Sequence, residues 1–92
     1  MAKAILINDR DSVAIASAPV KKGERVFYRR GGEECSVTAL ADIPVYHKIA
    51  VANVPQGKAV FKYGEPIGRA TQDIAVGEHV HTHNLTDIEE GR

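Results

Sequence analysis

The chain has 92 residues, of which 43% are hydrophobic and 26% charged, a composition that suits one folded domain with a modest core. Twelve basic and twelve acidic residues give a formal net charge of zero, so charge offers no reason to expect nucleic acid or an anionic membrane as a partner. A single cysteine, Cys35, excludes an internal disulfide, and no apolar run is long enough to cross a membrane. We therefore expect a protein of the cytoplasm.

Short runs of β-branched and apolar residues alternate with turn residues along the chain. Strands are expected at residues 3–7, 12–16, 25–29, 35–39, 48–53, 60–62, 67–71 and 78–85. The segments between them are rich in Gly, Pro, Asp and Asn, and no window shows a helical period. The pattern predicts one all-β domain over residues 1–85, followed by a flexible tail at residues 86–92.

A short repeat runs through this pattern. The spacing apolar-x-x-Gly-x-x-apolar begins at Val20, Val54 and Ile74, and a degenerate copy begins at Ile43 with Tyr46 in place of glycine. Each copy looks like a strand end, a turn whose glycine frees the backbone, and a new strand. Small β proteins can share such turns by chance, but four copies in this chain favour a genuine structural repeat.

Three of the four histidines lie in the stretch at residues 77–84, which reads G-E-H-V-H-T-H-N. Alternate residues of a strand point to the same face, so an extended stretch would place His79, His81 and His83 in one row. Such a row is a candidate binding edge for a metal or a substrate. The alternative interpretation is a strand face that is simply solvated.

The sequence resembles a known family where K-Y-G-E-P-I-G, at residues 62–68, is followed by D-I-x-x-G-E-H-V-H-x-H-N at residues 73–84. It is similar to the N-terminal SAF domain, or detached small subunit, of the altronate/galactarate dehydratase family. D-I-P at residues 42–44 and H-K-I-A at residues 47–50 extend the resemblance. Tyr46 departs from it, because the family pattern more often has glycine there. The resemblance implies a β-clip, a compact all-β fold of short strands and hairpins.

The resemblance also implies a function. It indicates the small part of a hydro-lyase that dehydrates a sugar acid of the altronate or galactarate type, inactive until a large catalytic subunit or domain completes the site. The small subunit of sulfolactate sulfo-lyase looks like the same domain, so a sulfo-lyase is one alternative. A non-catalytic module that binds an acid or carbohydrate is another, and a structural domain through which a partner oligomerises is a third. Whether several copies of this chain associate is left open.

A reaction of this kind needs a base, an acid and positive charge near the substrate carboxylate. The resemblance implies catalytic roles for His81, His83 and His79, with His81 and His83 as metal ligands. The expected cofactor is a divalent metal, iron or manganese, shared with the large subunit.

Lys62, His47 and Lys48 are the expected substrate-binding residues, since cationic groups suit a carboxylate. For Lys62 the alternative is an ordinary surface lysine before a turn, and for His47 and Lys48 it is a solvated pair on a strand edge. Cys35 is expected to be a small buried apolar residue and not a nucleophile.

Overall fold

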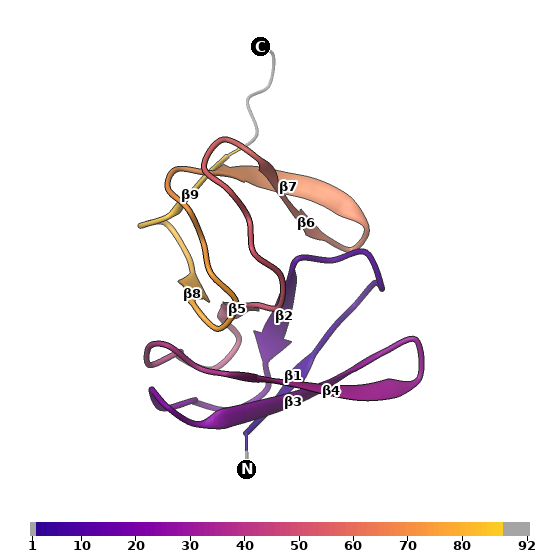
Figure 1. Ribbon diagram of the computed structural model, residues 1–92. Coiled ribbons are helices and arrows are strands. Elements are labelled where there is room, and N and C mark those ends of the chain that lie inside the picture. The colour runs from indigo at the N-terminus through magenta and orange to yellow at the C-terminus, as the bar shows by residue number, and fades with distance from the viewer. Residues whose placement is uncertain (1, 88–92) are drawn as a thin grey trace.

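The computed structural model describes residues 2–87 and shows nine strands, with no helix among these residues (Figure 1). The prediction of an all-β domain is confirmed. The strands are β1 (Ala2–Ile5), β2 (Val13–Ala16), β3 (Arg25–Arg30), β4 (Glu33–Thr38), β5 (Lys48–Ala50), β6 (Ala59–Lys62), β7 (Glu65–Ala70), β8 (His79–Val80) and β9 (Leu85–Asp87). The described part of the chain accordingly has no helix that could span a membrane.

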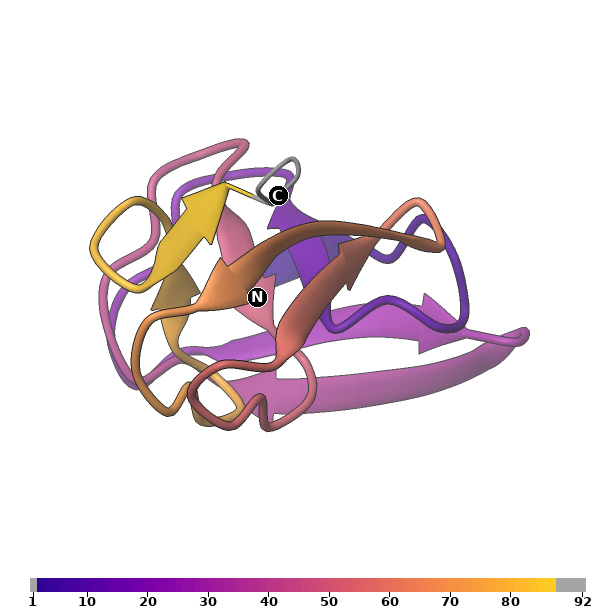
Figure 2. The ribbon, with the colours of Figure 1, turned by 90° about the horizontal axis from the view of Figure 1, so that it is seen from above.

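The strands form two sheets that lie one above the other (Figures 1 and 2). The larger sheet has the order β4-β3-β1-β2-β5-β8, and the smaller has the order β6-β7-β9. All pairs are antiparallel except β1 and β3, which run parallel. The two-residue strand β8 forms one edge of the larger sheet, which leaves the residues around it near the surface.

Two apolar clusters form the core. The first lies among β1 to β5 of the larger sheet, and the second joins β2, β5 and β8 to the smaller sheet. The first contains Ala2, Ala4, Ala14, Ala16, Val20, Val26, Tyr28, Val37, Ala39, Ile43, Ile49 and Val51, with the half-buried Cys35 packed against it. The second contains Val13, Ala50, Val54, Val60, Ala70, Ile74 and Val80. Because Val80 is fully buried in the second cluster, β8 is anchored although it is short.

The four copies of the repeat adopt the same turn. In each, the third turn residue has a positive φ, and the N–H of the fourth donates to the carbonyl of the first at 2.9–3.1 Å. The third residues are Gly23, Tyr46, Gly57 and Gly77, with φ of 90°, 70°, 86° and 95°. The apolar residues before the turns pair as antiparallel bridges, Val20 with Ile43 and Val54 with Ile74. The repeat is therefore structural, with units paired one to another.

The prediction of a single strand at residues 78–85 is wrong. Only residues 79–80 are extended there, residues 81–84 turn, and β9 begins at Leu85. Thr86 pairs with Arg69 of β7, so the tail predicted to begin at residue 86 starts at least two residues too early. The rest of that predicted tail, residues 88–92, lies outside the described residues.

Candidate functional site

All four histidines gather at the edge of the larger sheet. His79 lies on β8, His81 and His83 follow in the turn, and His47 ends the turn before β5. The antiparallel pairing of β5 with β8 sets Ile49 opposite His79, which brings the two segments together. As a result, Nδ1 of His47 lies 2.9 Å from Nε2 of His79, and the rings of His47 and His81 stack with centroids 4.4 Å apart.

The sequence of its turn leaves the His47 ring available to the cluster. In two of the four turns the fourth residue is a glutamate whose carboxylate accepts a hydrogen bond from the N–H of the first residue. In one of them, Glu78 accepts the N–H of Ala75 at 3.1 Å. Pro44 is the first residue of the His47 turn and has no N–H to donate. The side chain of His47, the fourth residue, therefore has no such N–H to bind, and its imidazole can turn toward His79.

Asn84 shapes the other half of the cluster. It is fully buried, and its Oδ1 accepts the N–H of His81 at 3.0 Å while its Nδ2 donates to the carbonyl of His79 at 2.9 Å. Its own N–H donates to the carbonyl of His81 at 3.1 Å. These bonds close a turn that reverses the direction of the chain. The rings of His79 and His81 lie nearly parallel, with centroids 5.6 Å apart, although the strand does not continue to His81. The histidines are clustered by a turn and not by the expected alternation.

Three of the four histidines could share one ion. One ring nitrogen from each of His47, His79 and His81 lies within 4.8 Å of the others. Neutral imidazole is a common ligand of divalent transition metals, and three such ligands leave coordination positions for a substrate. The donor set therefore fits the expected metal.

The geometry gives a different ligand set from the expected pair of His81 and His83. His83 is exposed, its ring is tilted by 38° against that of His79, and it lies outside the group of three. His47, which we assigned to the substrate, takes its place among the candidate ligands. Both histidines remain in the cluster.

The surroundings of His79 and His81 favour their uncharged rings. The pKa of His79 is lowered from its ordinary value of 6.5 by burial and then by the neighbouring His47, His83, His81 and Lys48. The pKa of His81 is lowered by desolvation and by His47, Lys48 and His83. Each charged neighbour that acts on these two rings is itself a cation in its charged form. The rings are therefore kept in the neutral state, which is the state that binds a metal.

The two expected lysines have different places. Lys48 is half-buried on β5 beside Val80, and its pKa is lowered by burial and then by Lys62. Its charge reaches His79 and His81, so it belongs to the cluster. Lys62 ends β6 with its Nζ 4.9 Å from the Tyr63 ring centroid, and the β6–β7 turn lies on the opposite side of the molecule from the turn after β8 (Figures 1 and 2). Lys62 is linked to the site through Lys48, whose pKa it lowers.

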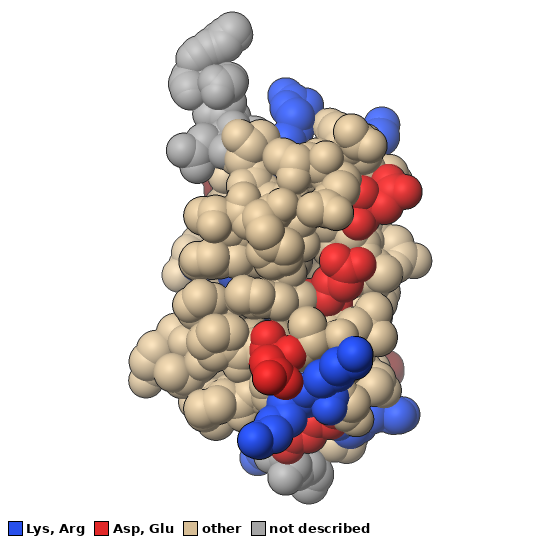
Figure 3. Space-filling model, turned by 90° about the vertical axis from the view of Figure 1, so that its left-hand side faces the viewer, with Lys and Arg blue, Asp and Glu red and all other residues tan. Residues whose placement is uncertain are grey.

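Figure 3 shows the side of the molecule on which β8 and the turn after it lie in Figure 1. Acidic side chains follow one margin of this face, and lysines and arginines gather at its lower end and upper edge. A broad area between them shows little charge at its surface. This face of the molecule thus has a largely uncharged centre, as a docking face often has.

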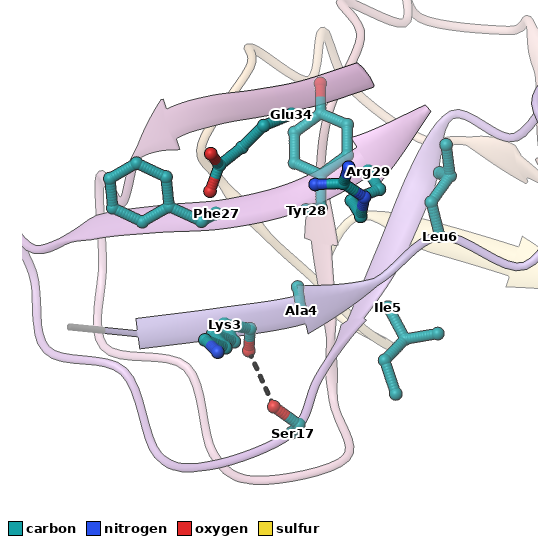
Figure 4. A pocket seen from close by; sticks show the side chains of 9 residues that line it. All are labelled: Lys3, Ala4, Ile5, Leu6, Ser17, Phe27, Tyr28, Arg29 and Glu34. Atoms are coloured by element: carbon teal, nitrogen blue, oxygen red, sulfur yellow. Dashed lines mark hydrogen bonds between the residues drawn. The ribbon is translucent and has the colours of Figure 1, made fainter. Parts of the chain in front are cut away.

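A groove of about 470 Å³ lies elsewhere, on the outer face of β1 and β3 (Figure 4). Its walls include Lys3, Ile5, Phe27 and Glu34, and the hydroxyl of Ser17 donates to the carbonyl of Lys3 at 3.0 Å along its rim. None of the histidines or of the expected substrate-binding residues lines it. The groove is therefore separate from the cluster.

Comparison with known proteins places this geometry in a family context. The family pattern described as the altronate/galactarate dehydratase SAF domain matches residues 2–88. The chain is similar to the altronate dehydratase of Bacillus subtilis (strain 168), with 39% identity over 89 residues, which are 92% of this chain and 17% of that protein. It is also similar to the altronate dehydratase of Escherichia coli (strain K12), with 39% identity over 92 residues, 96% of this chain and 18% of that protein.

A third relative is named as a separate subunit. The chain is 52% identical over 48 residues to the (2R)-sulfolactate sulfo-lyase subunit alpha of Paracoccus pantotrophus. These residues are 52% of this chain and 72% of that subunit. By contrast, the chain spans less than a fifth of the length of the two altronate dehydratases.

Proposed function

The chain belongs to the altronate/galactarate dehydratase SAF domain family, and on that premise we propose that it is the small part of a hydro-lyase acting on a sugar acid of the altronate or galactarate type. It contributes its histidine cluster to an active site that a large catalytic part completes. The observation that carries the proposal is the group of His47, His79 and His81, whose ring nitrogens lie within 4.8 Å of one another.

The cluster suits the chemistry of such an elimination. Removal of a proton next to a carboxylate builds negative charge on the carboxylate oxygens, and positive groups placed beforehand lower that barrier. A divalent metal, iron or manganese, held by His47, His79 and His81 would act there as a Lewis acid. Lys48 adds a cationic group beside the cluster and helps to orient the carboxylate. His83, outside the group of three, is the histidine assigned to proton transfer.

The proposal includes a partner because the described residues supply only part of a site. The histidines lie at a sheet edge, and a domain of this size has little depth with which to exclude water. The altronate dehydratases are more than five times as long as the segment that this chain matches, which leaves ample chain for the missing walls and the missing base. We therefore expect no turnover by this chain alone.

A sulfo-lyase is the second candidate, favoured by the similarity to a sulfolactate sulfo-lyase subunit that is itself a separate chain. In that case the leaving group is sulfite in place of water. Both reactions need positive charge near the carboxylate, which the metal and Lys48 would supply.

The test is a lyase assay on altronate, galactarate and sulfolactate with this chain, a large subunit of the family from the same genome, and their mixture. We expect turnover in the mixture only, and the preferred acid decides between the two candidates. Turnover by this chain alone would reject the shared site. A silent mixture in which complex formation is confirmed would reject the catalytic role and favour a binding module.

A further inference from the structure

Tyr46 has a backbone conformation that its side chain disfavours. Its φ is 70°, whereas the equivalent position in the other three turns is glycine, at Gly23, Gly57 and Gly77. A left-handed conformation brings the Cβ of a non-glycine residue close to the following carbonyl oxygen, and it is an outlier for a bulky side chain. The chain therefore retains a strained tyrosine where the rest of the repeat uses glycine.

The fold itself makes little use of the tyrosine ring. Tyr46 is 75% exposed, the most exposed large apolar residue of the described chain. The turn is held by main-chain bonds, from Tyr46 N–H to the Ala16 carbonyl at 2.8 Å and from His47 N–H to the Pro44 carbonyl at 3.1 Å. Glycine could make the same bonds without strain. The ring is thus available for a contact outside the described domain.

The position of the ring indicates which contact. Tyr46 directly precedes His47, one of the three candidate metal ligands. A second exposed apolar residue, Leu40, lies beside the turn that leads into His79, because its N–H donates to the Gly77 carbonyl at 2.8 Å. Exposed apolar residues therefore adjoin both segments that form the cluster.

We propose that Tyr46 anchors the large catalytic part of the enzyme over the histidine cluster. Its ring enters an apolar pocket on that part, with the hydroxyl meeting a hydrogen-bond acceptor. Tyrosine suits this role, because it offers a large contact area at a small entropic cost and is enriched in interface cores. The inference rests on the proposed function, and the occupant is a protein surface because the altronate dehydratases extend far beyond the matched segment.

The experiment compares Tyr46→Gly with a matched control, Tyr63→Gly. Tyr63 is also exposed, at 59%, and also has a left-handed φ, of 61°, but it lies in the β6–β7 turn on the opposite side of the molecule (Figures 1 and 2). Affinity for a large subunit of this family from the same genome is measured by calorimetry. We expect Tyr46→Gly to weaken binding at least tenfold and Tyr63→Gly to leave it within twofold, with neither variant melting below the wild type.

Each other outcome has a definite meaning. Wild-type affinity in Tyr46→Gly would overturn the docking role, and so would a raised KM for the acid with unchanged affinity, which would make Tyr46 a substrate contact. A wild-type chain that fails to bind the large subunit would instead contradict the proposed function itself. Tyr46→Phe separates the two parts of the contact, because it keeps the ring and removes only the hydroxyl.

Discussion

Replacement of Asn84 by alanine should loosen the histidine cluster without touching a histidine. The buried amide accepts the N–H of His81 and donates to the carbonyl of His79, so Asn84→Ala removes two hydrogen bonds and leaves two main-chain groups without that partner. A hydrogen bond contributes about 1 kcal/mol net, and a buried group left unpaired costs about 1–3 kcal/mol. Because the turn is near the surface, water can replace part of the loss. We expect a loss of about 2–3 kcal/mol in the free energy of unfolding.

The measurement is urea denaturation together with calorimetric titration of a divalent transition metal. Groups that orient metal ligands typically change affinity by about 10–100-fold when they are removed, and we expect a loss in this range for Asn84→Ala. Asp73→Ala is the control, since Asp73 also supports the main chain through a side-chain bond, from Gln56 N–H at 2.8 Å, but in an exposed loop. The control should lose about 1 kcal/mol or less and keep its metal affinity.

The reasoning is refuted if Asn84→Ala unfolds as the wild type does, or if it binds the metal as tightly as the wild type. It is also refuted if Asp73→Ala loses metal affinity to the same extent, because the effect would then follow from general loosening of the domain.

Two further predictions concern the turn glycines and the pH dependence of stability. Gly77→Ala should destabilise the domain clearly more than Gly57→Ala. Both positions have a positive φ, but only at Gly77 would a Cβ lie 2.1 Å from the Thr38 carbonyl oxygen. Equal unfolding free energies of the two variants would contradict this. Without metal, the wild type should lose stability relative to His79→Gln as the pH falls below 6.5, since the folded-state pKa of His79 is lowered and the unfolded state takes up the proton first. Unfolding in chelator from pH 8 to pH 5 measures this, and a relative gain for the wild type at low pH would be the wrong sign.

The all-β fold could be predicted from sequence because the turn that repeats through it is set by local sequence. A turn with a positive φ at its third residue favours glycine, so the spacing around Gly23, Gly57 and Gly77 is visible without a structure. The repeat even located the fourth turn, where Tyr46 replaces glycine. Which units pair with one another was not predictable, since the bridges between Val20 and Ile43 and between Val54 and Ile74 join distant segments.

The sequence drew attention to all four histidines of the cluster but did not show how they are arranged. Alternating histidines suggested a straight strand, and nothing local showed that buried Asn84 would bind two main-chain groups and close a turn. The approach of His47 to His79 was not predicted, because it depends on the pairing of β5 with β8. One signal was present in the repeat, since His47 and Glu78 occupy the same, fourth position of their turns, directly before β5 and β8.

The central claim, that histidines from two turns form one metal site, is tested most directly by titrating a divalent transition metal into the wild type and into four single histidine-to-alanine variants. We predict one ion per chain in the wild type, a loss of affinity of about 10-fold or more in His47→Ala, His79→Ala and His81→Ala, and nearly wild-type affinity in His83→Ala. The absence of binding by the wild type would contradict the claim. So would a variant His47→Ala that binds normally while His83→Ala does not, which is the result expected from a straight row of histidines.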